Sequence, residues 1–258
     1  MSGRLLHCTG LTVKFGGVTA LNALDLGVAD GEILGLIGPN GSGKTTFFNV
    51  VSGVYRLNAG SIMLAGQDVT RASAQALYRS GLARTFQRSR LCLPLTVFDN
   101  VVIGAHRRIR SGLLHNLFAR KALGREVDLY VDECQRLLGI FNPALATRLL
   151  DPAITLGMID RRRVEICRAL LSHPKLLLLD EPSAGMTHDE TGQLMSEILD
   201  VRKQFGDLAI IIIEHEMGVI ERVTDRCVVL NYGRKICEGR FRDVAADPVM
   251  REAYLGQA

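Results

Sequence analysis

One stretch of this chain combines glycines, a lysine and a threonine at a spacing that suits phosphate binding. It reads Gly38-Pro39-Asn40-Gly41-Ser42-Gly43-Lys44-Thr45 and matches the pattern G-x-x-x-x-G-K-[ST] at every required position. Glycines let the backbone curl so that successive N–H groups face phosphate oxygens. Lys44 can place its charge on the β- and γ-phosphates, and the Thr45 hydroxyl can ligate Mg²⁺. The stretch therefore predicts a nucleoside triphosphate site.

The residues on either side of this loop predict the setting that the pattern requires. Residues 32–37 are an apolar run typical of a buried strand, and Thr46 opens residues 46–51, which are typical of a helix. The positive N-terminal end of such a helix completes an anion site. A flexible glycine turn is the alternative interpretation, and the strand–loop–helix context favours binding.

Two acidic residues follow a second apolar run. Residues 176–179 are four leucines, and Asp180 and Glu181 come directly after them. Ligands of α/β sheets bind at the carboxyl ends of the strands. We expect Asp180 to hold Mg²⁺ through water, and Glu181 to orient and deprotonate an attacking water as general base. A strand that simply ends in a charged turn is the alternative, and the complete phosphate loop upstream favours catalysis.

A third aliphatic run, residues 209–213, ends at Glu214-His215-Glu216. His215 could donate to the γ-phosphate, or it could hold Glu181 and the water in line. A histidine after a strand is often structural. Its place after a strand that should lie beside the one ending at Asp180 favours a catalytic role.

Composition limits the class of protein. A hydrophobic fraction of 47% and a charged fraction of 22% are those of an ordinary globular chain of 258 residues. The net charge of 31 − 27 = +4 is too small to indicate nucleic acid. The aliphatic runs are far shorter than the roughly 20 residues that span a bilayer. Six scattered cysteines without a C-x-x-C pair argue against a disulfide framework or a zinc site, and predict reduced thiols in a cytoplasmic chain.

The pattern along the chain predicts how the elements are organised. Residues 4–30 and 60–70 alternate as half-exposed antiparallel strands do, and residues 98–150 are helical in character. After residue 160, helix and strand alternate, which predicts a parallel sheet with crossover helices. A basic segment from residue 107 to 121 could contact a membrane subunit or lipid, although its mixed composition favours a solvated helix face.

Taken together, these residues resemble the ATP-binding subunits of ABC transporters, over essentially the whole chain. The resemblance implies an α/β P-loop NTPase fold: a RecA-like parallel sheet core, an antiparallel β subdomain and an inserted α-helical subdomain. It implies a single nucleotide-binding domain over residues 1–258, with the helical insertion at about 88–160. Gln87 matches the Q-loop, where it would touch Mg²⁺ and the water while the loop faces membrane subunits. Phe15 takes the place of the aromatic that stacks on adenine, with an ordinary core aromatic as the alternative.

Within that family the chain looks most like the branched-chain amino acid importers. The segments that carry this likeness are Arg84–Gln87, Arg90-Leu91, Thr96-Val97, Asn100-Val101, Arg162–Leu170 and Glu252–Gly256. The likeness implies ATP and Mg²⁺ as cofactors, transmembrane permease subunits as partners, an indirect link to a periplasmic or extracellular solute-binding protein, and no nucleic acid. It places the chain peripherally on the cytoplasmic face of the inner membrane. Lipopolysaccharide exporter ATPases share several of these segments.

One departure from the family concerns the signature Leu-Ser-Gly-Gly-Gln, which in the resemblance reaches across a dimer to the partner's γ-phosphate. The chain has Leu156-Gly157-Met158-Ile159-Asp160 there. It lacks the serine hydroxyl, and an acid about 6 Å from a phosphate charge costs roughly 3 kcal/mol at an effective dielectric near 20, part of which Arg161, Arg162 and Arg163 could cancel. Thr187-His188 also replaces the usual residues in the loop after Glu181. We hypothesise an asymmetric pair with a different ATP-binding chain; a second copy of this chain and a tolerated local variant are the alternatives.

The predicted function is ATP hydrolysis that powers import of branched-chain or related amino acids or small carboxylates. Alternatives are the ATPase of a lipid or lipopolysaccharide exporter, and a weakly hydrolysing regulatory subunit. A soluble ABC ATPase of DNA repair or translation is disfavoured, because the chain has neither a long coiled-coil insertion nor a second nucleotide domain. The transported substrate cannot be inferred, since membrane and binding subunits select it.

Overall fold

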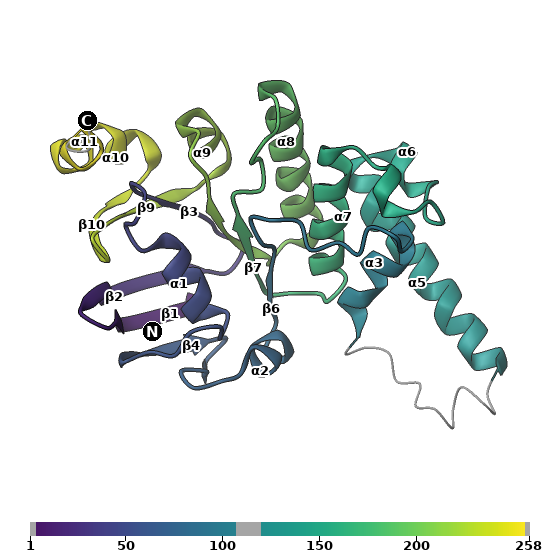
Figure 1. Cartoon of the computed structure of the whole chain (residues 1–258), viewed down its shortest axis with the longest axis horizontal. Coiled ribbons are helices and arrows are strands. Elements are labelled where there is room, and N and C mark those ends of the chain that lie inside the picture. The colour runs from purple at the N-terminus through teal and green to yellow at the C-terminus, as the bar shows by residue number, and fades with distance from the viewer. Residues whose placement is uncertain (1–3, 107–119, 256–258) are drawn as a thin grey trace.

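A computed structural model describes residues 4–106 and 120–255, whose strands form two sheets flanked by helices (Figure 1). The antiparallel sheet has the order β2-β1-β4-β5, from β1 (Arg4–Phe15), β2 (Val18–Ala29), β4 (Ala59–Leu64) and β5 (Gln67–Asp68). The strands and the hairpin predicted for residues 4–30 and 60–70 are therefore confirmed.

The second sheet has the order β10-β9-β3-β8-β7-β6. Its strands are β3 (Ile33–Ile37), β6 (Leu82–Arg84), β7 (Leu176–Asp180), β8 (Ala209–Ile213), β9 (Arg226–Asn231) and β10 (Arg234–Gly239). Neighbours from β9 to β6 pair in parallel, as predicted, and β10 joins antiparallel to β9. Every residue of β3, β7 and β8 is buried, which explains their unbroken aliphatic runs.

Alternate residues of these strands enter two separate cores. Leu34, Leu176 and Ile211 face a core shared with the antiparallel sheet and with α1 (Lys44–Val51). Leu177 and Ile212 face the other core, which contains buried residues of α7 (Met158–Leu170), α8 (His188–Phe205) and α9 (Met217–Val223). The sheet is thus covered on both faces, as a parallel sheet requires.

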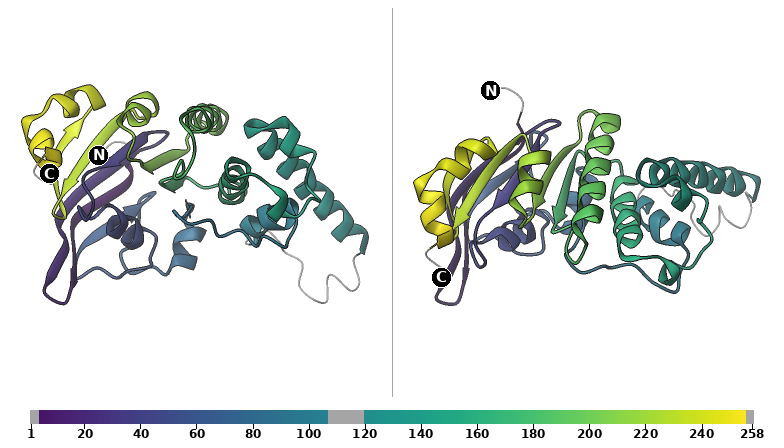
Figure 2. Two further views of the ribbon diagram at one scale, coloured as in Figure 1. Left: turned by 45° about the horizontal axis from the view of Figure 1, so that its top comes forward. Right: turned by 90° about the horizontal axis from the view of Figure 1, so that it is seen from above.

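The remaining helices occupy three places in the chain. They are α2 (Ala74–Arg79), α3 (Val97–Val102), η1 (Ile103–Ala105), α5 (Arg120–Phe141), α6 (Pro143–Ala146), η2 (Ala153–Thr155), α10 (Phe241–Ala246) and α11 (Pro248–Leu255). Elements α3 to α7 lie between β6 and β7 in sequence and gather at one end of the molecule (Figure 2). Helical structure within residues 98–150 is confirmed where it is described. On α5 the apolar face buries Cys134, Leu137 and Leu138, whereas Val127, nearer the start of the helix, is 42% exposed.

Two predictions about this region are not tested. Residues 107–119 of the basic segment lie outside the described residues. The division into one domain with a helical insertion at about 88–160 stays a prediction. Across the described parts of the chain, no helix combines the length and apolar character needed to cross a bilayer.

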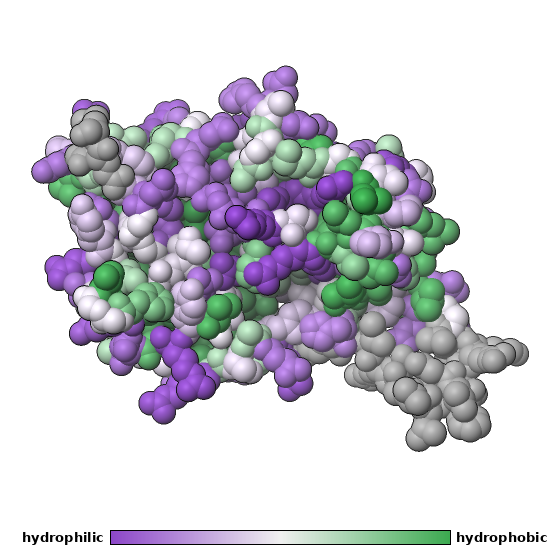
Figure 3. All heavy atoms as spheres, viewed as in Figure 1, coloured by the Kyte–Doolittle hydropathy of each residue, from purple (hydrophilic) through white to green (hydrophobic). Residues whose placement is uncertain are grey.

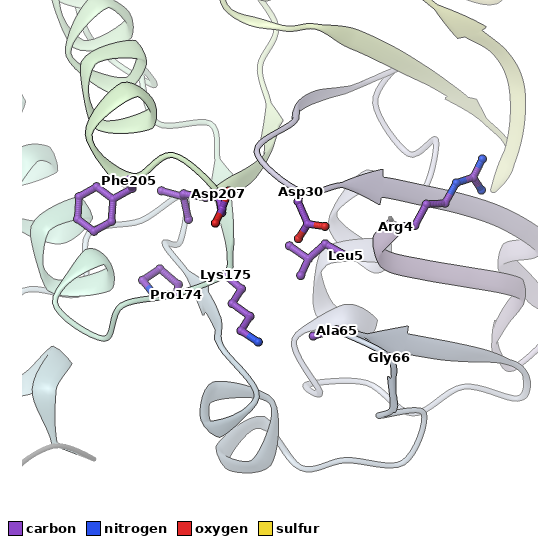
Figure 4. A pocket seen from close by; sticks show the side chains of 10 residues that line it. Arg4, Leu5, Asp30, Ala65, Gly66, Pro174, Lys175, Phe205 and Asp207 are labelled. Atoms are coloured by element: carbon purple, nitrogen blue, oxygen red, sulfur yellow. The ribbon is translucent and has the colours of Figure 1, made fainter. Parts of the chain in front are cut away.

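The parallel pairing gives the sheet two functionally different edges. The loops that enter β3, β7 and β8 lie at the amino edge, where Asp30, Lys175 and Asp207 line a shallow pocket (Figure 4). The phosphate loop, Asp180 and the residues after Ile213 lie at the carboxyl edge, because they follow those strands. Ligands of α/β sheets bind at the carboxyl edge.

The cysteines provide a chemical test of this packing. Cys134 is fully buried, and burial together with the nearby Glu133 carboxylate raises its pKa to about 12, whereas Cys92 is exposed. Because the thiolate is the nucleophile, iodoacetamide at pH 8 should label Cys92 at least about tenfold faster than Cys134, as measured by peptide mass spectrometry. Labelling in 6 M guanidinium (roughly the unfolding range) serves as the control. Equal rates in the folded protein would contradict the packing of α5.

Candidate active site

The phosphate loop connects β3 to α1, as predicted, and has a backbone that only glycine can adopt at two positions. Gly38 has φ 147°, and a Cβ there would lie 2.1 Å from the Leu230 oxygen. Gly43 has φ 107°, and a Cβ would lie 2.7 Å from the Ala20 oxygen. These close approaches hold the loop against β2 and β9, so the chain has a formed cradle for an anion at the start of α1.

Polar groups inside this cradle suit a phosphate chain. Lys44 is 6% exposed, and its Nζ donates to the carbonyl oxygens of Gly38 (2.6 Å) and Pro39 (2.9 Å). Burial lowers the pKa of Lys44, and the carboxylates of Glu181 and Asp180 oppose this shift. The buried Ser42 Oγ has no hydrogen-bond partner within the described chain. A buried hydroxyl without a partner and a curled glycine backbone are the features that a bound phosphate would satisfy.

Glu181 stands between two other predicted residues. Its Oε2 accepts from Gln87 Nε2 at 2.7 Å, and its Oε1 lies 2.6 Å from His215 Nε2. Since a carboxylate accepts, this arrangement makes Nε2 the protonated nitrogen of His215. Glu181 has φ 46°, in the left-handed region that non-glycine residues rarely adopt. Strain of this kind is typical of functional positions, and three residues chosen from sequence meet at one carboxylate.

The neighbouring carboxylates are held by other side chains. Asp180, 4% exposed, accepts from Arg84 Nη2 at 2.9 Å. Burial raises the pKa of Asp180, and its hydrogen bond to Arg84 opposes the shift. Glu214 accepts from the Ser183 amide (2.9 Å) and hydroxyl (2.6 Å), which ties the loop after Glu181 to the end of β8. Burial also raises the pKa of Glu214, against the bonds from Ser183.

Gln87 is also held through its backbone by the helix that follows the signature position. Arg162 on α7 donates to the carbonyl oxygens of Phe86 (2.9 Å) and Gln87 (3.0 Å). Glu165, one turn later, pairs with Arg162 at 2.8 Å and accepts from the Arg90 amide at 2.6 Å. Hydrogen bonds therefore tie the Q-loop backbone to α7.

Comparison with known proteins identifies the family of this site. A sequence model described as ABC transporter matches residues 21–184. The chain belongs to the ABC transporter family. It is 34% identical over 259 residues to the high-affinity branched-chain amino acid transport ATP-binding protein BraF of Pseudomonas aeruginosa, and covers 100% of both chains. Identity to the protein of the same description named LivG, from Escherichia coli, is 35% over 258 residues, again with 100% of both covered.

A solved structure gives the same result. The ADP conformation of MJ1267, an ATP-binding cassette of an ABC transporter, matches with a TM-score of 0.84 at 28% identity, covering 99% of this chain and 100% of that one. The predicted P-loop NTPase fold is confirmed, and the chain is an ABC ATPase.

The signature position of this ABC ATPase lies at the start of α7. Leu156 is buried, Gly157 is the N-cap residue and makes no side-chain capping bond, and Met158 is 55% exposed. Asp160 pairs with Arg163 at 2.7 Å. The first turn of α7 has the free backbone N–H groups of any helix start, and its side chains include the acidic Asp160 and the basic Arg161, which donates to the Ile154 oxygen at 2.7 Å.

Phe15 lies at the end of β1, 47% exposed, with its ring centroid 5.2 Å from that of Tyr55 in an edge-on contact. A half-exposed ring fits a stacking role better than the alternative of a core aromatic. Thr45 is exposed and Thr46 half-buried in the first turn of α1.

Sequence reasoning missed the roles of Arg84, Glu214 and Arg162. Arg84 is the last residue of β6, and Glu214 directly follows β8; these two strands lie on either side of β7, which ends at Asp180. A polar residue at the carboxyl end of such a strand is a sequence feature from which a role at the site can be predicted. No local sequence pattern predicts the role of Arg162, because its partners in the Q-loop precede it by 75 and 76 residues.

The role of Glu181 is open to direct test. Glu181→Gln keeps the size of the side chain but removes the general base, so we expect ATP binding to persist and kcat to fall by about 10² to 10⁴. Calorimetry for binding and phosphate release for turnover are the measurements. Glu221→Gln, which removes a carboxylate paired with Arg242 on the surface, is the matched control and should leave both unchanged. Near-normal turnover by Glu181→Gln would contradict the assignment.

Proposed function

We propose that this ABC ATPase powers the import of branched-chain or related amino acids or small carboxylates. The observation that carries the catalytic part is the Glu181 carboxylate, held by Gln87 and His215 at the sheet edge that bears the phosphate loop. The substrate class is supported by full-length similarity to the proteins named BraF and LivG.

Each predicted site residue has a role in this proposal. The backbone N–H groups of residues 38–45 other than Pro39 and the Lys44 ammonium bind the phosphates, and Phe15 stacks on adenine. Glu181 takes the proton of the attacking water, while His215 and Gln87 fix the carboxylate that receives it. Because Gln87 and His215 occupy different oxygens of Glu181, the carboxylate cannot rotate freely.

The residues present also fit Mg²⁺. Thr45, Asp180 and Gln87 offer a hydroxyl, a carboxylate and an amide, which are the oxygen donors that Mg²⁺ prefers. Within the described residues, no group of three His, Cys, Asp or Glu side chains could hold a metal by itself. That agrees with Mg²⁺, which is held by one or two carboxylates together with substrate phosphates. When bound, Mg²⁺ would neutralise developing charge on the phosphates.

The partners follow from the same proposal. Transmembrane permease subunits would place the chain peripherally at the cytoplasmic face of the inner membrane, with a solute-binding protein acting on the other side. An exporter ATPase is the alternative. Apolar surface gathers over the helical end of the molecule (Figure 3), where Leu150, Ile154 and Met158 are more than half exposed. Ile154 precedes the signature segment and Met158 lies within it, and we expect this segment to face a second ATP-binding subunit.

We further propose that this second subunit is a different chain. Arg163 is shared between Asp160 and Glu197, to which it donates twice, at 2.6 and 2.9 Å. One positive charge therefore faces two carboxylates, so Arg163 neutralises Asp160 only in part; Arg161 in the same turn, which donates to the Ile154 oxygen at 2.7 Å, reduces the remaining negative charge. A partner's γ-phosphate would meet that charge where the family offers a serine hydroxyl. This chain's own ATP, completed by a normal signature from the partner, would turn over faster than the partner's ATP.

Restoring three of the four signature positions that differ tests the asymmetric pair. Gly157 has φ −65° and ψ 169°, and a Cβ there meets nothing within 4 Å, so serine fits. We expect the purified subunit alone to hydrolyse ATP slowly, and the combined change Gly157→Ser, Ile159→Gly and Asp160→Gln to raise its turnover by at least about tenfold. Adding Glu181→Gln to that variant should abolish the gain. Brisk turnover by the unmodified subunit, insensitive to these changes, would instead indicate a tolerated local variant.

Reconstitution tests the import role. A complex with its permease subunits in proteoliposomes should hydrolyse ATP several-fold faster when a leucine-loaded binding protein is added, because the loaded protein favours the hydrolysing state. Radiolabelled leucine uptake and phosphate release are the measurements, with ligand-free binding protein as control. Hydrolysis without uptake, in a complex that lacks a binding protein, would favour the exporter. A subunit that binds ATP but never hydrolyses it in any pair would favour the regulatory alternative.

A further inference from the structure

Arg84 makes a buried contact with one of the three side chains expected to hold the metal ion. It is the last residue of β6, which pairs in parallel with β7 so that Arg84 lies opposite Leu178. Its Nη2 donates to Asp180 Oδ2 at 2.9 Å, and the two side chains are 5% and 6% exposed. The Asp180 carboxylate is therefore fixed from the side of β6.

The other arm of the same guanidinium reaches the helix that carries Thr45. Arg84 Nη1 donates to Asn49 Oδ1 at 2.7 Å and to Ser52 Oγ at 2.9 Å. Asn49 comes four residues after Thr45 on α1, and residues four apart lie one above the other on a helix. One planar, rigid group thus joins the expected carboxylate ligand to the helix of the expected hydroxyl ligand.

Two aromatic rings hold this group in place. The Arg84 Cζ lies 5.4 Å from the ring centroid of Phe48 on α1 and 4.8 Å from that of Phe86. Phe86 directly precedes Gln87, the third expected ligand. Arg84 therefore contacts all three segments that would supply oxygen to the metal.

A buried ion pair gives little net stability compared with apolar side chains of similar size, because desolvation offsets its attraction. Stability alone is thus a weak reason for a guanidinium here. We propose that Arg84 is a positioning residue of the metal site, which sets the spacing between Asp180 and Thr45 before nucleotide and metal arrive. This inference rests on the Mg²⁺ site proposed above.

Since Arg84 lies at the junction of β6 and the Q-loop, it also gives a route from that loop to the metal site. A displacement of Phe86 would shift the ring against which the guanidinium lies. Arg162, on α7, holds the same residue through its carbonyl oxygen.

The test is metal affinity, measured without hydrolysis. Mn²⁺ binding to the full chain in the presence of ADP is followed by electron paramagnetic resonance. We expect Arg84→Met to weaken Mn²⁺ binding by at least about tenfold, Arg84→Lys to recover part of the loss, and ADP affinity in EDTA to stay as in the unmodified protein. A purely structural role would weaken ADP binding in EDTA as well.

Two further variants keep the test decisive. Arg90→Met removes a guanidinium that also lies on the Phe86 ring, 3.8 Å from its centroid, and should leave Mn²⁺ affinity unchanged. Asn49→Ala with Ser52→Ala removes the α1 arm while keeping the Asp180 pair, and should weaken Mn²⁺ binding several-fold even if Arg84→Met does not fold.

Unchanged Mn²⁺ affinity in folded Arg84→Met, or in the Asn49 and Ser52 double variant, would overturn the inference about Arg84. It would not contradict the proposed metal site. Absence of Mn²⁺ binding to the unmodified protein with ADP would overturn the metal site itself, and this inference with it.

Discussion

The in-register parallel pairing of β7 with β8 is the constraint on which the catalytic edge depends. It sets Asp180 opposite Ile213, and the Glu181 amide then donates to the Ile213 oxygen at 3.0 Å. Glu181, the first residue after β7, and His215, the second residue after β8, come within hydrogen-bond distance as a result. A shift of one residue would turn every side chain of the strand to the other face, so burial of the two aliphatic runs protects the register and the site together.

Each of the three buried ionisable side chains described at this edge has a charged or polar neighbour. Lys44 feels the carboxylates of Glu181 and Asp180, Asp180 is paired with Arg84, and Glu214 is satisfied by Ser183. Burial lowers the pKa of Lys44 and raises the pKa of Asp180 and of Glu214, so it favours the neutral form of each group. Charged or polar neighbours oppose each of these shifts. Polar groups that are fixed before the substrate arrives need little reorganisation during reaction.

The chain's own ATP site and its signature segment differ in how many of the family's residue types they contain. Its own phosphate loop and the cluster around Glu181 contain every residue type that the family resemblance requires. The signature segment has the helix end but lacks the hydroxyl, and its acid shares one arginine with Glu197. Thr187, which departs from the family, caps α8 together with Glu190, so that change has a local structural role. These contrasts agree with the proposal of an asymmetric pair.

Much of this could be predicted from local pattern. The phosphate loop, the buried strands and the acids after them are contiguous in sequence, and glycine geometry and aliphatic burial act over a few residues. Gln87, Glu181 and His215 could be named because each follows a recognisable strand or motif.

The partners of these residues could not be predicted, since they join segments far apart in the chain. Arg84 meets Asn49 and Asp180 across the sheet, and Arg162 reaches back to the Q-loop. Side chains of this kind carry no periodic pattern, because their geometry is set by how strands and helices are ordered in space. Local chemistry thus identified the reacting groups, and three-dimensional packing decided what holds each one in place.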